Sequence, residues 1–94
     1  MLKEKLQDFI DDLFNGWIDL ACDDIDELEA YDLVEGEEKD YARARLQEVA
    51  DDVKYFVDEE LQWYTNDIEI LNADKAELVD TLKEVLKELH YDVK

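Results

Sequence analysis

The side chains that perform catalysis in many small proteins are scarce in this chain. It contains one cysteine, Cys22, and one histidine, His90, and it contains no serine. A serine nucleophile is therefore excluded, and a thiolate pair would require Cys22 and His90 to meet from opposite ends of the chain. One Cys and one His also leave no set of zinc ligands at the usual spacing. We expect no catalytic residues, no cofactor and no metal site, and we predict that the protein is not an enzyme.

Carboxylates are the one reactive group in large excess, with 29 Asp and Glu against 10 Lys and Arg and a net charge of −19. Carboxylates bind calcium, but an EF-hand loop also needs Gly at its sixth position and alternating oxygen ligands. Counting back from Gly36 puts Tyr31 at the first position, and counting from Gly16 puts Leu13 at the third. Neither glycine fits, so we expect only weak, nonspecific binding of divalent ions. A carboxylate pair for glycoside hydrolysis cannot be singled out among so many acids.

The densest acidic segment runs from Asp19 to Asp40. It contains eleven acids and one base, Lys39, which is a formal charge of −10. In a helix that rises about 1.5 Å per residue, a half-acidic segment carries one carboxylate for roughly every 3 Å. One strand of DNA carries one phosphate for about every 3.4 Å. We therefore expect this segment to attract proteins that bind the phosphates of nucleic acid.

Apolar residues at helical spacing predict the fold that must position these acids. We predict an all-α protein, a small antiparallel bundle of three main helices with a short extra helical turn, in a single domain over residues 1–94. Apolar residues keep one phase from Leu2 to Leu28, which predicts one long helix over about residues 2–30. Gly inside a helix costs only about 1 kcal/mol, so we expect the helix to continue through Gly16. If the helix kinks, this is the residue at which we expect the kink.

The rest of the chain divides into a loop, a second helix, a connection and a last helix. Gly36 and the absence of a period predict a loop over about residues 31–36. The second helix is expected to continue to Tyr64, and residues 65–72 to form a connection with one helical turn. The last helix is expected to begin at a cap supplied by Asn72 or Asp74.

Projection of the first two helices places most of their acids opposite the apolar faces. Tyr55 falls among these acids, whereas Glu60 projects into the apolar face, where a charge needs a partner. Crowded carboxylates raise one another's pKa values, so we expect stability to increase as pH falls from 7 towards about 5. The predicted partner-binding residues are Asp19, Asp23, Asp26, Glu27, Glu29, Asp32, Glu35, Glu37, Glu38, Asp40, Asp51, Asp52, Tyr55, Asp58 and Glu59.

The charge also indicates which partners to exclude. Direct binding to nucleic acid or to an anionic membrane needs clustered bases, and the bases here are scattered among the acids. No apolar run reaches the ~18 residues of a spanning helix, and the start MLKEKLQDF lacks the features of a secretory signal. Cys22 has no partner cysteine, which fits a reducing cytoplasm. The expected partner is a basic protein in the cytoplasm.

In size, helicity and acidity the whole chain resembles the phage-encoded DNA-mimic inhibitors, such as T7-type antirestriction proteins and acidic anti-CRISPR proteins. The segments that carry the resemblance are DDIDELEAYD, VEGEEKDY and VADDVKYFVDEELQWY, and they contain no shared motif. The resemblance implies a noncatalytic inhibitor that blocks the basic DNA-binding groove of a nuclease or CRISPR effector in the cytoplasm of a bacterial host. No site residue is carried over from these proteins.

Two alternatives remain open at the level of sequence. One is an adaptor, antitoxin or immunity protein whose acidity neutralises a single basic partner without competing with DNA. The other is an acidic chaperone for basic proteins. Both require the same excess of carboxylates, so composition does not separate them from a DNA mimic. The oligomeric state is left undetermined as well.

Overall fold

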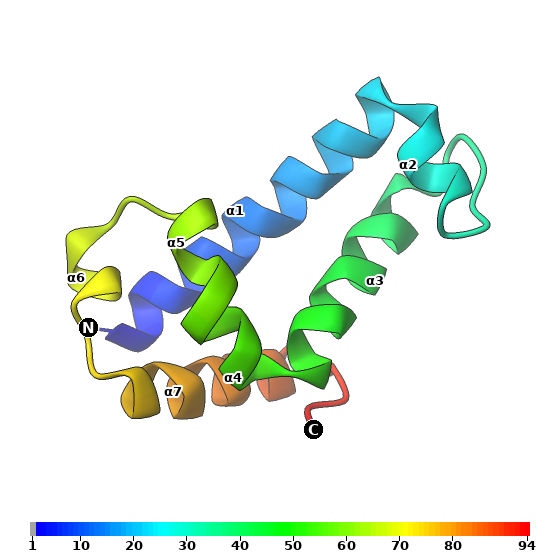
Figure 1. The fold of residues 1–94 in the computed structure, drawn as a ribbon. Coiled ribbons are helices and arrows are strands. Elements are labelled where there is room, and N and C mark those ends of the chain that lie inside the picture. The colour runs from blue at the N-terminus through cyan, green and yellow to red at the C-terminus, as the bar shows by residue number, and fades with distance from the viewer. Residues whose placement is uncertain (1) are drawn as a thin grey trace.

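The protein is all-α, as predicted. The computed structural model describes residues 2–94, and that part of the chain contains helices and turns without a strand (Figure 1). The compact body measures 39 × 25 × 21 Å. Its elements are, in order, α1 (Leu2–Asp23), α2 (Ile25–Glu29), α3 (Glu38–Asp51), α4 (Val53–Tyr55), the π-helical turn η1 (Phe56–Glu60), α5 (Leu61–Tyr64), α6 (Ile68–Leu71) and α7 (Lys75–Glu88).

Four helical bodies, rather than three, enclose the core. α1 packs along α3 and also against α7. In Figure 1 the chain turns back at the far end of α1, through α2 and a loop, and returns along α3. The elements α4, η1 and α5 follow one another directly and form a short rod, residues 53–64, that packs on α7. The sequence predicts three main helices, and the rod is a fourth helical body in addition to them.

The first helix is continuous through Gly16 but shorter than the sequence predicts. Asp24 leaves the helical conformation with φ −133° and ψ 100°, and its side chain accepts a hydrogen bond from the backbone N–H of Asp26. Asp24 thus ends α1 and caps α2, because an aspartate that bonds the backbone two residues ahead satisfies an otherwise free N–H. Leu20, before this break, and Ile25, after it, are both exposed on the surface instead of continuing the apolar stripe.

The predicted second helix is also interrupted. Asp52 has φ −150° and ψ 76°, and its side chain accepts a hydrogen bond from the backbone N–H of Tyr55. The rod that follows contains a π-helical turn, which fits one extra residue into a helical turn. This adjustment leaves Phe56, Val57 and Leu61 buried, so the predicted apolar face survives a break in the helix that carries it.

The core contains most of the apolar residues that the helical spacing predicts and two that it does not. Most of its buried side chains come from α1, α3, the rod and α7, Leu28 comes from α2, and within residues 2–94 none of the buried residues is charged. Tyr41 is completely buried although it lies outside the predicted stripe, and Ile70 of the short helix α6 is 2% exposed. The single helical turn predicted within residues 65–72 is present as α6, and it supplies a core side chain.

Asp74 forms the predicted cap of α7. Its carboxylate accepts hydrogen bonds from the backbone N–H groups of Ala76, at 2.9 Å, and Glu77, at 3.3 Å. Replacing Asp74 with Ala should lower the free energy of unfolding by about 1 kcal/mol, measured by urea denaturation. Asp80→Ala, an exposed acid further along the same helix, is the matched control and should change it by less than about 0.5 kcal/mol. Equal effects of the two substitutions would contradict the capping role.

Candidate partner-binding surface

The densest acidic segment folds into one end of the molecule. Residues 19–40, which we call the acidic tip, comprise the end of α1, all of α2, the following loop and the start of α3 (Figure 1). Their carboxylates are exposed, except for Glu27, Glu37 and Glu38, which are partly buried. No helix among residues 2–94 has the length and apolar character needed to cross a membrane.

Acids from two different helices meet at the acidic tip. Partial desolvation and the carboxylates of Glu38, Asp19 and Asp23 raise the pKa of the Cys22 thiol. The start of α3 thus lies close to the end of α1, and their charges add. These acids do not converge on a point, since no three His, Cys, Asp or Glu side chains among residues 2–94 are placed to hold a metal ion.

The charge of the acidic tip is almost unneutralised. Within residues 2–94, the one tip carboxylate in an ion pair is Asp40, whose Oδ1 lies 3.3 Å from Nη1 of Arg43. Five of the nine other bases pair with acids elsewhere: Lys3 with Glu84 and Glu88, Lys5 with Asp67 and Glu69, Arg45 with Glu48, Lys75 with Asp58, and Lys94 with Asp51. The negative potential is therefore strongest at the acidic tip, where, among the described residues, a single ion pair neutralises one of the carboxylates.

No protein-family model, curated protein or solved structure matches this chain. What the acidic tip does must therefore be inferred from the chemistry and placement of its own residues.

The structure separates the second group of predicted site residues from the acidic tip. The second group begins at the other end of α3, whose 14 residues span about 20 Å at 1.5 Å per residue. Asp51 is the last residue of α3, and Asp52, Tyr55, Asp58 and Glu59 follow it. This group is also less negative, because Asp51 and Asp58 lie 3.4 Å and 3.8 Å from lysine ammonium groups. The residues predicted from the sequence thus form two surfaces, and the acidic tip is the more strongly charged.

Hydrogen bonds to two tyrosines attach the acidic tip to α3. The Tyr31 hydroxyl donates to Oε1 of Glu48 at 2.6 Å, and the Tyr41 hydroxyl donates to Oε2 of Glu27 at 3.1 Å. The two rings meet edge to face with their centroids 5.2 Å apart. Glu27 was expected to point away from the core, and this expectation is wrong, since its carboxylate is partly buried against Tyr41.

Arg45 contacts the same cluster. Its guanidinium carbon lies 5.0 Å from the centroid of the Trp17 ring, and its Nη1 donates to the Tyr41 hydroxyl at 3.2 Å. A planar guanidinium both stacks on aromatic rings and donates several hydrogen bonds. The sequence reasoning missed Tyr41 and this role of Arg45, although their spacing of four residues places both on one face of α3.

Burial and the hydrogen bond to Glu48 raise the pKa of Tyr31 from its ordinary value of 10.0 to about 12. The folded state thus favours the protonated phenol, and this stabilisation is complete below pH 10 and is lost as pH rises from about 10 through 12. In an alkaline titration followed by tyrosinate absorbance, Tyr31→Phe should remove a late-titrating group. Tyr55→Phe, at an exposed position, should leave that group in place. If the late-titrating group is still present in the Tyr31→Phe variant, the contact between Tyr31 and Glu48 is contradicted.

Two carboxyl groups outside the acidic tip change in the direction opposite to the sequence-based expectation. A hydrogen bond from Gln47, with help from Lys94, lowers the pKa of Asp51, and a hydrogen bond from Lys5 lowers the pKa of Asp67. A lowered folded pKa gives stability that is fully present above the ordinary value of 3.8 and is lost as pH falls from that value through the lower folded pKa. These two groups therefore make the folded protein less stable, not more stable, as the pH becomes acidic.

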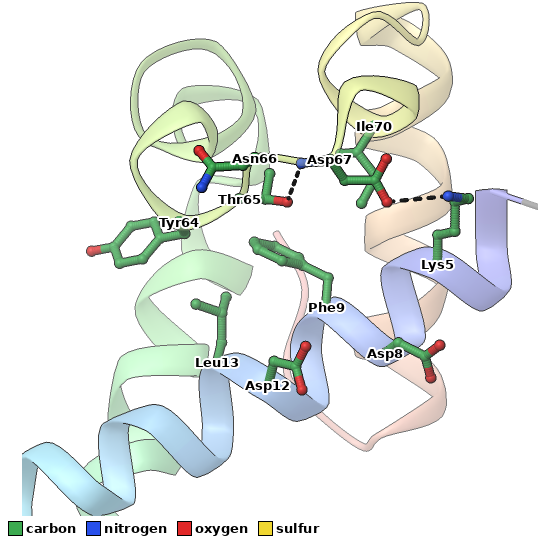
Figure 2. A pocket seen from close by; sticks show the side chains of 10 residues that line it. All are labelled: Lys5, Asp8, Phe9, Asp12, Leu13, Tyr64, Thr65, Asn66, Asp67 and Ile70. Carbon is green, nitrogen blue, oxygen red and sulfur yellow. Dashed lines mark hydrogen bonds and ion pairs between the residues drawn. The ribbon is translucent and has the colours of Figure 1, made fainter.

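A groove of about 470 Å³ lies between α1 and residues 64–70, away from the acidic tip (Figure 2). Phe9, Leu13 and Ile70 contribute its apolar lining. The ammonium of Lys5 is bound to Oδ2 of Asp67 at 3.1 Å, and the Asp67 N–H donates to Thr65 Oγ1 at 3.1 Å. These contacts attach the segment before α6 to α1, so the side chains of Lys5, Thr65 and Asp67 serve the fold.

Proposed function

We propose that this protein is a noncatalytic inhibitor whose acidic tip binds the positively charged groove with which a nuclease or CRISPR effector holds nucleic acid. The observation that supports this most directly is the exposure of the tip carboxylates with a single ion pair, at Asp40. So many unneutralised like charges repel one another and oppose the compact state. A basic partner relieves this repulsion when it binds.

Electrostatics explains how such an inhibitor would compete with nucleic acid. A concentrated negative surface steers a basic partner towards it and speeds association, and added salt weakens this attraction. The carboxylates occupy the basic side chains that would otherwise contact phosphates, so the substrate is excluded. The bonds of Tyr31 and Tyr41 to Glu48 and Glu27 hold the acidic tip in one conformation before binding, which reduces the entropy lost in the complex.

Charge alone does not select one basic groove over another, so apolar contacts must add selectivity. The acidic tip supplies them: Ile25, between Asp24 and Asp26, is 50% exposed, and Val34, which precedes Glu35, is 64% exposed. Tyr55, which is one of the predicted partner-binding residues, and Trp63 are also exposed, but both belong to the rod. We therefore assign the selective contacts of the acidic tip to Ile25 and Val34.

These apolar side chains also favour a second candidate function. DNA has no group on its phosphate backbone that corresponds to isoleucine or valine. Imitation of DNA charge alone therefore does not require these two side chains. An antitoxin or immunity protein that neutralises a basic partner at a site outside the DNA groove would use both the charge and the apolar contacts. The two candidates differ in whether nucleic acid competes for the partner.

Competition with duplex DNA tests the proposal. The protein would be immobilised, proteins from a bacterial lysate captured on it, and the captured partner identified by mass and purified. Excess duplex should release the partner from a DNA mimic, and the protein should in turn release DNA from the partner. A partner that stays bound in excess duplex, and that still binds DNA while bound, would overturn the DNA-mimic proposal in favour of the second candidate.

A further inference from the structure

A small pocket lies between α1, α3 and the rod, outside the acidic tip. Its volume is about 170 Å³, and the residues that line it include the aromatic residues Trp17, Tyr55 and Tyr64 and the acids Glu48, Asp52 and Glu60. Pockets for small organic ligands usually measure about 300 to 1,000 Å³. This one is smaller and has the size to admit a single side chain.

Three of the charged groups in the walls already have partners. Arg45 is the one base among them, and its guanidinium donates to the hydroxyls of Tyr41 and Tyr64 at 3.2 Å and 3.4 Å. Glu48 accepts from Tyr31 and lies 3.8 Å from Arg45. Asp52 caps α4 through the N–H of Tyr55. These contacts hold the walls in place.

Glu60 is the exception. Its side chain is partly buried, yet it forms no ion pair or hydrogen bond with any side chain in residues 2–94. It is the last residue of the π-helical turn η1, and such turns occur frequently at functional sites. No buried side-chain polar atom among residues 2–94 lacks a hydrogen-bond partner, so the Glu60 carboxylate is not sealed in the core, and it stays accessible to an incoming cation.

We propose that this pocket receives an arginine side chain of the basic partner, which pairs with Glu60. The inference rests on the proposed function only in taking the partner to be basic. Three carboxylates against one guanidinium leave the walls negative, so they attract a cation in spite of Arg45. Arginine fits better than lysine because its planar guanidinium stacks on aromatic rings and binds a carboxylate through two parallel hydrogen bonds.

The pocket also gives a role to two predicted site residues that lie outside the acidic tip. Asp52 lines the pocket and caps the start of the rod, and Tyr55, which also lines the pocket, is 54% exposed. A partner that touches both the acidic tip and this pocket would contact the length of α3. The acidic tip would then supply attraction over distance, and the pocket would accept one defined side chain.

The test uses the isolated protein and a small probe, so that no partner is needed. N-acetyl-arginine methylamide and its neutral citrulline counterpart would be titrated into the protein while the two indole N–H signals are followed by NMR. Trp17 lines the pocket and the exposed Trp63 does not, and Trp63→Phe assigns the two signals. Arginine should shift the Trp17 signal saturably and leave the Trp63 signal in place, and citrulline should shift neither. Equal shifts with citrulline would overturn the proposal on the native protein, whatever the variants do.

Two substitutions on the same turn separate the pocket from general negative charge. Glu60→Gln keeps the side-chain volume and should weaken arginine binding about tenfold, as expected for the loss of a charge-assisted hydrogen bond. Glu59→Gln removes an equal charge at an exposed position outside the pocket and should leave binding unchanged. Equal weakening by the two substitutions would assign the effect to diffuse charge.

This test can fail independently of the proposed function. Reversing the charges of Asp19, Asp23 and Asp26 in the acidic tip should abolish inhibition of the partner while the arginine probe still shifts the Trp17 signal. If the protein inhibits its partner but does not bind the arginine probe, the proposal for the pocket is wrong and the proposal for the acidic tip stands. If it binds the probe but the charge reversal does not affect inhibition, the proposal for the acidic tip is wrong and the proposal for the pocket stands.

Discussion

Simultaneous replacement of Asp19, Asp23 and Asp26 by lysine should weaken binding to the basic partner by roughly 100-fold or more, because opposed like charges cost several kcal/mol. The three side chains are exposed, and within residues 2–94 none takes part in an ion pair. Their reversal should therefore leave the helical content intact, as measured by circular dichroism. Glu27 is left unchanged because it accepts a hydrogen bond from the buried Tyr41.

A second triple variant controls for net charge. Glu4, Glu77 and Asp80 are exposed and lie outside the acidic tip, and among residues 2–94 their side chains have no ion-pair partner. Lysine at these three positions changes the total charge by the same amount. Equilibrium binding of the purified partner at several salt concentrations should show strong weakening for the tip variant alone. If the tip variant still competes with DNA for the partner, the acidic tip is an ordinary solvated surface.

Tyr41→Ala should lower the free energy of unfolding by about 3 to 5 kcal/mol, the usual cost of removing a large buried aromatic ring. Tyr41 is completely buried, meets Tyr31 edge to face and lies 5.9 Å from the guanidinium carbon of Arg45. Truncation removes these contacts together and leaves Glu27 without its hydrogen-bond donor. Urea denaturation followed by circular dichroism measures the change.

Tyr41→Phe separates the ring from the hydroxyl. It keeps the buried ring and removes the bonds to Glu27 and Arg45, so it should cost about 1 to 2 kcal/mol. A tyrosine whose main contribution is its ring will show the larger loss in the alanine variant. Equal losses in the two variants would mean that the hydroxyl contacts matter more than the packing of the ring.

The local parts of the fold were predictable from the sequence because short-range periodicity and capping determine them. The apolar phase correctly predicts that α1 continues through Gly16, and the position of Asp74 correctly predicts the start of α7. The acid density from Asp19 to Asp40 likewise indicates the most negative surface. Each of these inferences needs only neighbours within a few residues.

The breaks at Asp24 and Asp52 were not predictable in this way. The apolar spacing continues across both positions, so nothing in the local pattern marks them as ends of helices. Each aspartate caps the next helix only because the chain turns there, and the turns bring α3 alongside α1 and the rod onto α7. The gain in packing between distant segments outweighs the loss of a few helical hydrogen bonds.

Tertiary structure alone decides which acids stay free. Asp51 and Asp58 are as acidic in sequence as Asp23 and Asp26, yet Lys94 and Lys75 reach them from far along the chain. Composition contains the same charges in either case. The difference in charge between the two acidic surfaces arises because ion pairs depend on distance in space, and helix packing determines which bases lie within that distance.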